Sequence, residues 1–200
     1  MSDAPSASVS ASTPGVLSDD DFAVDVTENR VVFEGAVWNI VRDTFRYGDT
    51  SLKREYMDHT GAVAIAAQDD QGRILLIKQY RHPVRSRDWE LPAGLLDIPG
   101  EDPLLAAKRE LAEETDLQAA TWEHLLTFNT TPGGSNEHVA IYLATGVRAA
   151  DEAFDREAEE ADIEKRWVPV GDVVDGVLGG GLHNSILSIA ALALHARATR

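Results

Sequence analysis

Three glutamates stand close together in a segment that favours a helix. Glu110, Glu113 and Glu114 lie within residues 103–115, PLLAAKRELAEET, which are mostly strong helix formers. At about 100° per residue, the three side chains fall on one arc of the helix. A hard cation such as Mg²⁺, Mn²⁺ or Ca²⁺ would offset their mutual repulsion, because carboxylate oxygens suit such ions. The spacing therefore predicts a divalent-metal site, with a solvated acidic face as the alternative.

Local chemistry sets the ends of this helix. Asp102 is a good N-cap residue, and Pro103 suits the first helical position. At the other end, Asp116 enters the left-handed backbone region more easily than most residues, although glycine is preferred there. Leu104 and Leu111 lie on a face different from that of the glutamates. We expect these two leucines to enter the core.

The glutamates belong to a longer ordered pattern, which begins with a glycine. Its members are, in order, Gly94, Glu101, Arg109, Glu110, Leu111, Glu113, Glu114, Asp116 and Leu117. The pattern resembles the box of the Nudix hydrolase family, G-x5-E-x7-R-E-U-x-E-E-x-G-U, in which U is bulky and apolar. It departs from the box twice, because the first gap is one residue longer and Asp116 replaces the last glycine. The extra residue falls in a loop, where length is tolerated, and neither departure alters the glutamates.

The resemblance implies a fold, a metal and a set of ligands. The implied fold class is α+β, a Nudix-type α/β/α sandwich with a mixed sheet and an N-terminal antiparallel strand region. The implied cofactor is Mg²⁺, with Mn²⁺ as an alternative. Arg109 is expected to orient a carboxylate of the box, Glu101, by a charge-assisted pair. The implied metal ligands are the carbonyl of Ala93 and the carboxylates of Glu110, Glu113 and Glu114.

Segments outside the box resemble the ADP-ribose pyrophosphatase branch of the family. They are the RE pair at 54–55, QYR at 79–81, WELPAG at 89–94 and TPGGSNE at 131–137, whose proline lies near the position of one that marks the branch. The resemblance implies an enzyme that hydrolyses ADP-ribose, a small-molecule nucleotide sugar, to AMP and ribose 5-phosphate. The substrate-binding residues that it implies are Trp38, Arg54, Glu55, Arg81, Glu90, Pro132 and Glu137.

Several of these assignments have alternatives. Arg54 and Arg81 are expected to bind phosphate, or they are surface arginines that lie over the sheet. Trp38 is expected to stack on adenine, as an aromatic residue does in relatives, or it belongs to the core or to a dimer interface. For the whole protein, the alternatives are a Nudix hydrolase of another nucleoside-diphosphate sugar or of an oxidised nucleotide, a non-catalytic Nudix-fold regulator that binds a ligand, and an interaction domain with an acidic surface helix.

A general base is expected outside the box. Residues 151–164 carry eight acids and little apolar pattern, which predicts a mobile loop. In the branch that the sequence resembles, a glutamate on this loop is implicated in catalysis. Counting back four from Ile163 gives that role to Glu159, with Glu160 as the neighbouring alternative. The remaining alternative is that these acids are only solvated.

Charge and composition argue against several classes of protein. Lys plus Arg is 18 and Asp plus Glu is 34, so the net charge of −16 argues against binding to nucleic acid or to an anionic membrane. The absence of cysteine excludes disulfides and thiolate metal sites, and it suits a cytoplasmic location. No run approaches the ~18 apolar residues of a membrane span. The N-terminus lacks the features of a signal peptide, and we expect residues 1–20 to be a disordered tail.

The strands are expected to come mostly before the last forty residues. Residues 21–58 alternate apolar and polar residues and predict a region of antiparallel strands, and residues 59–200 are expected to form the Nudix domain. Relatives in this branch are homodimers with exchanged N-terminal strands, and we expect the same arrangement here. Residues 62–67 and 73–80 flank the turn sequence DDQG, which predicts a β-hairpin.

Two helices are expected near the C-terminus. Residues 170–177 predict a short helix, and residues 182–198 predict a longer one. The longer segment has apolar residues at helical spacing, which predicts the face that enters the core. The residues of that face are Ile186, Ile189, Leu192 and Leu194.

Overall fold

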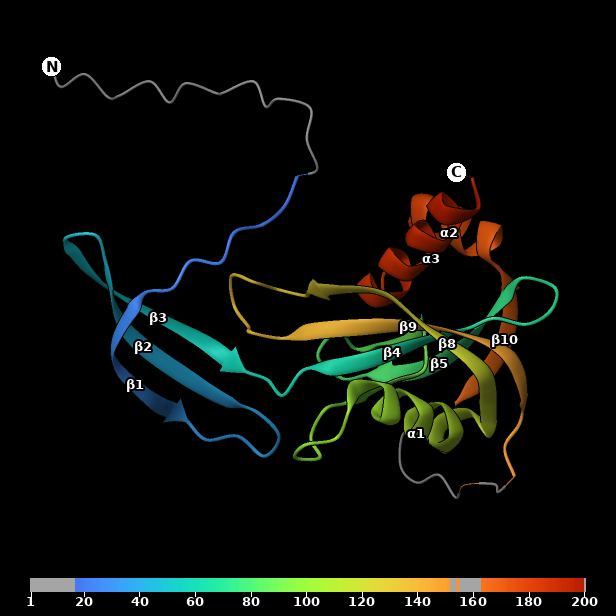
Figure 1. Cartoon of the computed structure of the whole chain (residues 1–200), viewed down its shortest axis with the longest axis horizontal. Coiled ribbons are helices and arrows are strands. Elements are labelled where there is room, and N and C mark those ends of the chain that lie inside the picture. The colour runs from blue at the N-terminus through green and yellow to red at the C-terminus, as the bar shows by residue number, and fades with distance from the viewer. Residues whose placement is uncertain (1–16, 152–153, 155–162, 200) are drawn as a thin grey trace, which may run out of the picture.

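The computed structural model describes residues 17–151, 154 and 163–199. Residues 1–16 of the tail predicted at 1–20 and the candidate bases Glu159 and Glu160 lie outside these residues. In the part of the chain that is described, ten strands and three helices follow one another (Figure 1). They are β1 (Asp25–Phe33), β2 (Asn39–Tyr47), β3 (Thr50–Asp58), β4 (Ala62–Ala67), β5 (Arg73–Arg81), β6 (Ser86–Glu90), β7 (Ala93–Leu95), α1 (Pro103–Thr115), β8 (Leu117–Asn129), β9 (His138–Ala149), β10 (Glu164–Pro169), α2 (Val170–Leu178) and α3 (Ser185–Ala198).

The central layer of the molecule consists of two sheets. One has the strand order β7-β4-β9-β8, in which β4 and β9 run parallel while the other pairs run antiparallel. The other sheet has the order β10-β5-β6 and is antiparallel. Helix α1 covers one face of this layer, and α2 and α3 lie over the opposite face (Figure 1). The predicted α+β fold, an α/β/α sandwich with a mixed sheet, is confirmed.

Strand β4 is buried on both faces, because the sheet lies between the two helix layers. Successive side chains of a strand point to opposite faces. The odd-numbered residues of β4 pack in a cluster with α1, and its even-numbered residues pack in a second cluster with α2 and α3. This strand therefore ties the two halves of the core to each other.

Helix α1 begins and ends where its sequence predicts. The Asp102 carboxylate accepts a hydrogen bond from the Leu104 amide at 2.9 Å, and Asp116 lies in the left-handed region with φ 59°. Leu111 enters the core as expected. Leu104, in contrast, is only half-buried, because two alanines in the following turn make the contact with the sheet.

The predicted hairpin of residues 62–67 and 73–80 is wrong. The turn itself forms, since the Asp69 amide donates to the Arg73 carbonyl at 3.0 Å. Beyond a single bridge between Gln68 and Ile74, however, β4 and β5 belong to different sheets. A strand has two edges, and those of β4 are taken by β7 and β9. Strand β5 pairs instead with β6 and β10.

The predicted core face of α3 is confirmed at Leu194, which is buried, and at Ile186 and Ile189, which pack half-buried against the core, but it is wrong at Leu192. Its buried residues are Leu187, Ala190, Ala191 and Leu194, whereas Leu192 is 41% exposed. The first three turns of this helix are apolar almost all round, so their periodicity does not identify the face that packs. Among the described residues, no helix combines the length and the apolar character that crossing a membrane requires.

The N-terminal strands form a separate antiparallel sheet, in the order β1-β2-β3, beside the sandwich (Figure 1). The loop at 131–137 holds the end of this sheet. The Met57 amide donates to the Gly134 carbonyl at 2.9 Å, and the His59 amide donates to Asn136 Oδ1 at 2.8 Å. The run TPGGSNE therefore positions the chain where it passes from β3 to β4.

Candidate active site

The centre of the candidate site is a contact between α1 and β7. A β-carbon placed on Gly94 would lie 1.9 Å from the carboxyl carbon of Glu110, a distance that real atoms do not reach. Residue 94 must therefore be a glycine if Glu110 is to keep its position. This contact explains why Gly94 and Glu110 occur in one sequence pattern, although the two residues lie on different elements.

A second carboxylate of α1 reaches the same short strand. Glu114 Oε2 accepts a hydrogen bond from the Ala93 amide at 2.9 Å, and Glu114 is only 5% exposed. Glu110 and Glu114 are one helical turn apart, so both carboxylates meet the first two residues of β7. The predicted role of Ala93 concerns its carbonyl, which remains a prediction.

Arg109 organises the remaining carboxylates of the helix. Its guanidinium donates to Glu101 Oε2 at 3.0 Å, to Glu110 Oε1 at 2.6 Å and to Glu113 Oε2 at 3.1 Å. A further bond from Nε reaches Glu101 Oε1 at 3.2 Å, so the pair with Glu101 is bidentate. The hydrogen bonds to Glu101 and the charge of Glu110 raise the pKa of Arg109, although burial acts against this rise. Arg109 is therefore a permanent cation among these three acids.

The chemistry of these donors fits a divalent cation. Burial raises the pKa of Glu110, and the nearby Arg109 offsets only part of that rise, so this carboxylate lacks full solvation. Within residues 17–151, 154 and 163–199, no three His, Asp or Glu side chains converge closely enough to enclose a metal ion. Carboxylate oxygens are the ligands that Mg²⁺ takes in proteins, together with water and substrate phosphate. The fit therefore rests on the α1 carboxylates as oxygen ligands.

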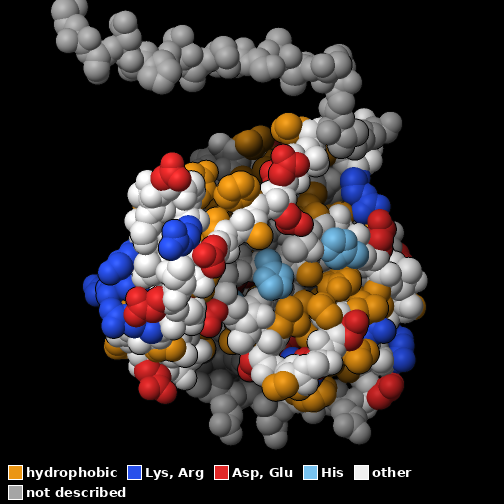
Figure 2. All heavy atoms as spheres, turned by 60° about the vertical axis from the view of Figure 1, so that its left-hand side comes forward, with side chains coloured by type: hydrophobic (Ala, Val, Ile, Leu, Met, Phe, Trp, Pro, Cys, Tyr) orange, Lys and Arg blue, Asp and Glu red, His pale blue; other side chains and the backbone are white. Residues whose placement is uncertain are grey.

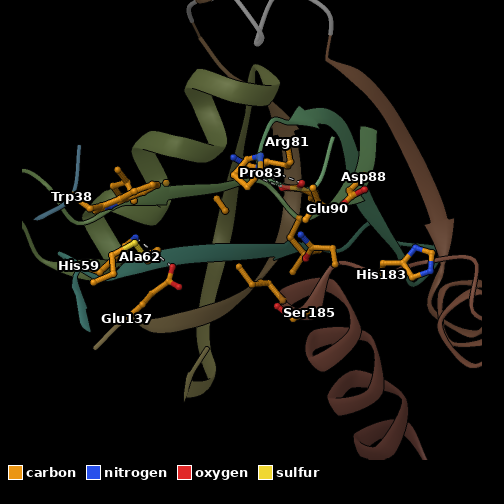
Figure 3. A pocket seen from close by; sticks show the side chains of 18 residues that line it. Trp38, His59, Ala62, Arg81, Pro83, Asp88, Glu90, Glu137, His183 and Ser185 are labelled. Carbon is orange, nitrogen blue, oxygen red and sulfur yellow. Dashed lines mark hydrogen bonds and ion pairs between the residues drawn. The ribbon is translucent and has the colours of Figure 1, made fainter. Parts of the chain in front are cut away.

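A pocket of about 520 Å³ opens beside β7, which is in the range of small-molecule sites. Among the residues expected to bind substrate or metal, it is lined by Trp38, Arg81, Glu90, Ala93 and Glu137. Figure 3 shows Trp38, His59 and Glu137 at one end, and Arg81, Asp88 and Glu90 further along. The other lining residues are Met57, His59, Ala62, Pro83, Val84, Asp88, Leu91, Gly94, Leu95, His183, Asn184, Ser185 and Ile186.

Arg81 lines this pocket, and a buried carboxylate holds its guanidinium in place. It makes three hydrogen bonds to the carboxylate of Glu90, with Nε to Oε1 at 2.9 Å, Nε to Oε2 at 3.1 Å and Nη2 to Oε2 at 2.6 Å. The Glu90 side chain is 4% exposed, whereas that of Arg81 is 45% exposed. The bonds to Glu90 raise the pKa of Arg81 against the effect of burial, and the charges of Glu114 and Asp88 raise it further. Arg81 thus lines the pocket and is close enough to Glu114 of the helix to feel its charge.

Three of the implied substrate-binding residues, and the four box residues Arg109, Glu110, Glu113 and Glu114, are not among the residues that line this pocket. Arg54 on β3 donates to the Lys53 carbonyl at 2.8 Å, and Glu55 pairs with Arg42 Nε at 2.6 Å. Pro132 is exposed in the turn at 131–135. Glu159, the candidate base, and its neighbour Glu160 fall outside the described residues. The roles of all these residues remain predictions.

Sequence reasoning missed other residues of the pocket. His59 is almost fully buried beside Trp38, Asp88 lies next to Arg81, and Ser185 begins α3 (Figure 3). None of the three stands in a motif that indicates a substrate site. The turn sequence HTG before the apolar strand β4 was the one signal for His59, because a glycine there indicates a close approach.

Comparisons with known proteins agree with this geometry. The family described as the NUDIX domain matches residues 57–184. The chain is 44% identical over 184 residues to a protein of Mycobacterium tuberculosis named ADP-ribose pyrophosphatase, covering 92% of this chain and 87% of that one. It is 36% identical over 130 residues to a Bacillus subtilis protein of the same name, covering 64% of this chain and 70% of that one.

A crystal structure described as that of an ADP compounds hydrolase shares the fold, with a TM-score of 0.73 and 21% identity. It covers 90% of this chain and 96% of that one. At this identity, the likeness concerns the fold alone. The family match extends over more than half of the chain and contains α1, β7 and the whole box. The chain belongs to the Nudix family.

Proposed function

We propose that this protein is a Mg²⁺-dependent hydrolase that cleaves ADP-ribose to AMP and ribose 5-phosphate, with Mn²⁺ as an alternative metal. One observation carries the chemistry: Glu110 and Glu114 meet β7 at the edge of a pocket that also contains Arg81. The substrate is supported by the two relatives named ADP-ribose pyrophosphatase, of which one is 44% identical over 92% of the chain.

The reaction divides among the residues as follows. Glu110 and Glu114 would hold the metal, with Glu113 and the carbonyl of Ala93 as further candidate ligands. When bound, the metal neutralises developing charge and lowers the pKa of a bound water. Arg109 keeps the carboxylates of the helix oriented through its hydrogen bonds to them. Water attacks one phosphorus, the bridging P–O bond breaks, and Glu159 is the proposed acceptor of the proton.

Electrostatics support a role for Arg81 in binding the substrate. The pyrophosphate of ADP-ribose carries two negative charges, and the net charge of the protein is −16. A field of this sign repels the substrate, so local cations must offset it. Arg81 lines the pocket and keeps its positive charge, because Glu90 holds its guanidinium. We assign Glu90 the task of orienting Arg81 toward the substrate.

A direct assay tests the proposal. The full chain should hydrolyse ADP-ribose with Mg²⁺ and lose activity when the metal is chelated. Glu110→Gln and Glu114→Gln should each lower kcat by about 10²-fold or more, whereas Glu123→Gln, an exposed acid paired with Arg197, should not. Turnover in H₂¹⁸O, with the products weighed by mass spectrometry, identifies the attacked phosphorus. Near-normal turnover by either helix variant would refute the metal assignment.

The N-terminal sheet supports a second part of the proposal, that the protein is a homodimer with exchanged N-terminal strands. All nine residues of β1 are exposed, and β1 is an edge strand with one unpaired side. Hydrophobic side chains here include Val31 and Phe33, which is 64% exposed. Figure 2 brings this side of the molecule forward and shows hydrophobic side chains at the surface among charged ones. A second copy of the chain would cover them.

A further inference from the structure

One end of the pocket is built from three segments that are far apart in the sequence. Trp38 lies between β1 and β2, His59 between β3 and β4, and Glu137 directly before β9. In Figure 3 the rings of Trp38 and His59 lie one above the other, and Glu137 points up toward them. His59 is the member that touches both of the others.

The hydrogen bonds of His59 determine which nitrogen of its ring carries a proton. The Gly61 amide donates to His59 Nδ1 at 3.0 Å, so Nδ1 is the acceptor and the neutral ring has its proton on Nε2. That Nε2 faces Glu137 Oε1 at 3.5 Å. The His59 side chain is only 3% exposed, so water does not compete strongly for either nitrogen.

The backbone around His59 leaves this ring little freedom. The His59 amide donates to Asn136 Oδ1 at 2.8 Å. Gly61 has φ +88°, and a β-carbon there would lie 3.0 Å from the His138 ring. Only glycine suits this position, so the amide that holds His59 Nδ1 is itself fixed.

The two residues that His59 contacts are the ones exposed to the pocket. The ring of Trp38 stacks on His59 at 5.3 Å between centroids and 23° between planes, and Trp38 remains 37% exposed. Glu137 Oε2 accepts a hydrogen bond from Thr130 Oγ1 at 2.5 Å, while Oε1 faces His59. The imidazole therefore holds an aromatic plane and a carboxylate at a set angle to each other.

We propose that His59 is a positioning residue that determines selectivity at this end of the pocket. It acts through Trp38, which offers a flat surface, and through Glu137, which accepts hydrogen bonds. The group that fits carries a flat or CH-rich face and hydrogen-bond donors, a description that applies to the nucleoside end and to the sugar end of a nucleotide sugar. This proposal rests on the proposed function, since it concerns the same pocket.

Two substitutions separate the contacts of His59. His59→Asn keeps an acceptor for the Gly61 amide but lacks the donor to Glu137, whereas His59→Gln keeps that donor and loses the acceptor. We expect His59→Asn to raise the KM for ADP-ribose about tenfold while kcat stays within about twofold. His59→Gln should recover the part of the affinity that depends on Glu137, because both variants lack the ring that stacks on Trp38. In a Glu137→Ala background, which removes the acceptor, His59→Asn should lose the part of its effect that runs through Glu137 and keep the part that runs through Trp38.

Controls and altered substrates complete the experiment. His124→Asn, in an exposed ring that contacts Tyr142 and Thr127, should leave both constants unchanged. Inosine-diphosphate-ribose changes the base, and ADP-glucose changes the sugar. His59→Asn should reduce the preference for ADP-ribose over one of the two, which identifies the end group that this part of the pocket reads. Thermal unfolding of every variant shows whether it is folded.

The outcomes separate this proposal from the proposed function. If wild-type protein hydrolyses ADP-ribose but a folded His59→Asn keeps its KM and selectivity, the role of His59 is refuted and the function stands. An equal loss in kcat for all substrates, without recovery in His59→Gln, would also refute it, because it would indicate a general structural defect. If wild-type protein neither hydrolyses nor binds ADP-ribose by calorimetry in the presence of chelator, both proposals fail.

Discussion

The carboxyl carbon of Glu110 lies 1.9 Å from the position that a β-carbon on residue 94 would take, so the Glu110 carboxylate occupies the room that any side chain at Gly94 would need. The two residues come from β7 and α1, and the missing β-carbon of Gly94 leaves the room that the Glu110 carboxylate occupies. The carboxylates that we assign to the metal therefore depend on a glycine that takes no part in the chemistry itself.

We predict that Gly94→Ala lowers kcat for ADP-ribose by about 10²-fold, because the new methyl group displaces Glu110 by an ångström or more. Steady-state kinetics with Mg²⁺ measures the effect. Gly133→Ala is the matched control, since a β-carbon there meets nothing within 4 Å. If Gly94→Ala retained wild-type kcat, the position of Glu110 would not matter for catalysis.

The ion pair of Arg81 and Glu90 should contribute to the free energy of unfolding. Arg81→Ala removes three hydrogen bonds from a buried carboxylate, and we expect it to lower the free energy of unfolding by about 2 kcal/mol. The full cost of breaking a buried ion pair is not expected, because Arg81 is half-exposed. Replacing Glu90 by Gln in the same chain should restore part of the stability, which urea unfolding measures. Additive losses in the double variant would contradict this coupling.

Asp116 replaces the last glycine of the family box. We expect its left-handed backbone to be strained and its side-chain contacts to offset that strain. It lies at φ 59°, and its side chain accepts from Lys165 Nζ at 3.3 Å and from the Phe154 amide at 3.1 Å. Asp116→Ala loses these contacts and keeps the strain, whereas Asp116→Gly loses both. We therefore expect the alanine variant to be less stable than the glycine variant by about 1 kcal/mol in urea unfolding. Equal stabilities would show that the backbone at this position is unstrained.

The turn before β5 should contribute a measurable dependence of stability on pH. Burial raises the pKa of Asp69, but hydrogen bonds from the Arg73 side chain and from the Arg73 and Gln71 amides lower it below its ordinary value of 3.8. A carboxyl group whose pKa is lowered by folding stabilises the protein above its unfolded pKa, and this stability is lost as the pH falls through the folded pKa. Between roughly pH 6 and pH 2, a window set by ordinary carboxyl pKa values, the free energy of unfolding should fall more steeply for wild type than for Asp69→Asn. Parallel curves would contradict the assignment.

The proposed dimer predicts a change of mass on substitution in β1. Phe33→Glu places a charge on the exposed edge strand, where we expect a second copy to bind, and should convert a dimer into a monomer. Light scattering after size-exclusion chromatography measures the mass. Leu178→Glu, at a residue that is 74% exposed at the end of α2, is the control and should leave the mass unchanged. A wild-type protein that runs as a monomer at micromolar concentration would refute the proposal.

The features that local chemistry determines were predictable from the sequence. The ends of α1 follow from the cap at Asp102 and the left-handed residue at Asp116, which act within one turn of the helix. The arc of Glu110, Glu113 and Glu114 follows from helical spacing alone, whereas the same spacing predicted burial of Leu104 and Leu111 and only Leu111 is buried. The layered fold followed from the resemblance in the box, and the family match agrees with it.

The wrong predictions concern the pairing partner of a strand and the packed face of a helix, which the local sequence does not determine. The apolar strand β4 was expected to pair with β5, but its edges are occupied by β7 and β9, which come from later in the chain. Helix α3 is apolar on most sides, and its contact with α2 and the sheet buries Leu187 and leaves the predicted core residue Leu192 exposed. In each case the partner surface decides, and that surface does not exist until the chain has folded.

The sequence by itself determined a metal-binding pattern on one helix, because the spacing of its carboxylates and caps depends on neighbours within a few residues. Only the tertiary structure showed that Glu110 shares its space with Gly94 and that Arg81 is held by a buried Glu90. It alone brought His59 between Trp38 and Glu137, which lie 99 positions apart in the chain (137 − 38). Contacts over such separations depend on how the sheets are ordered, and this order results from the packing of the whole molecule.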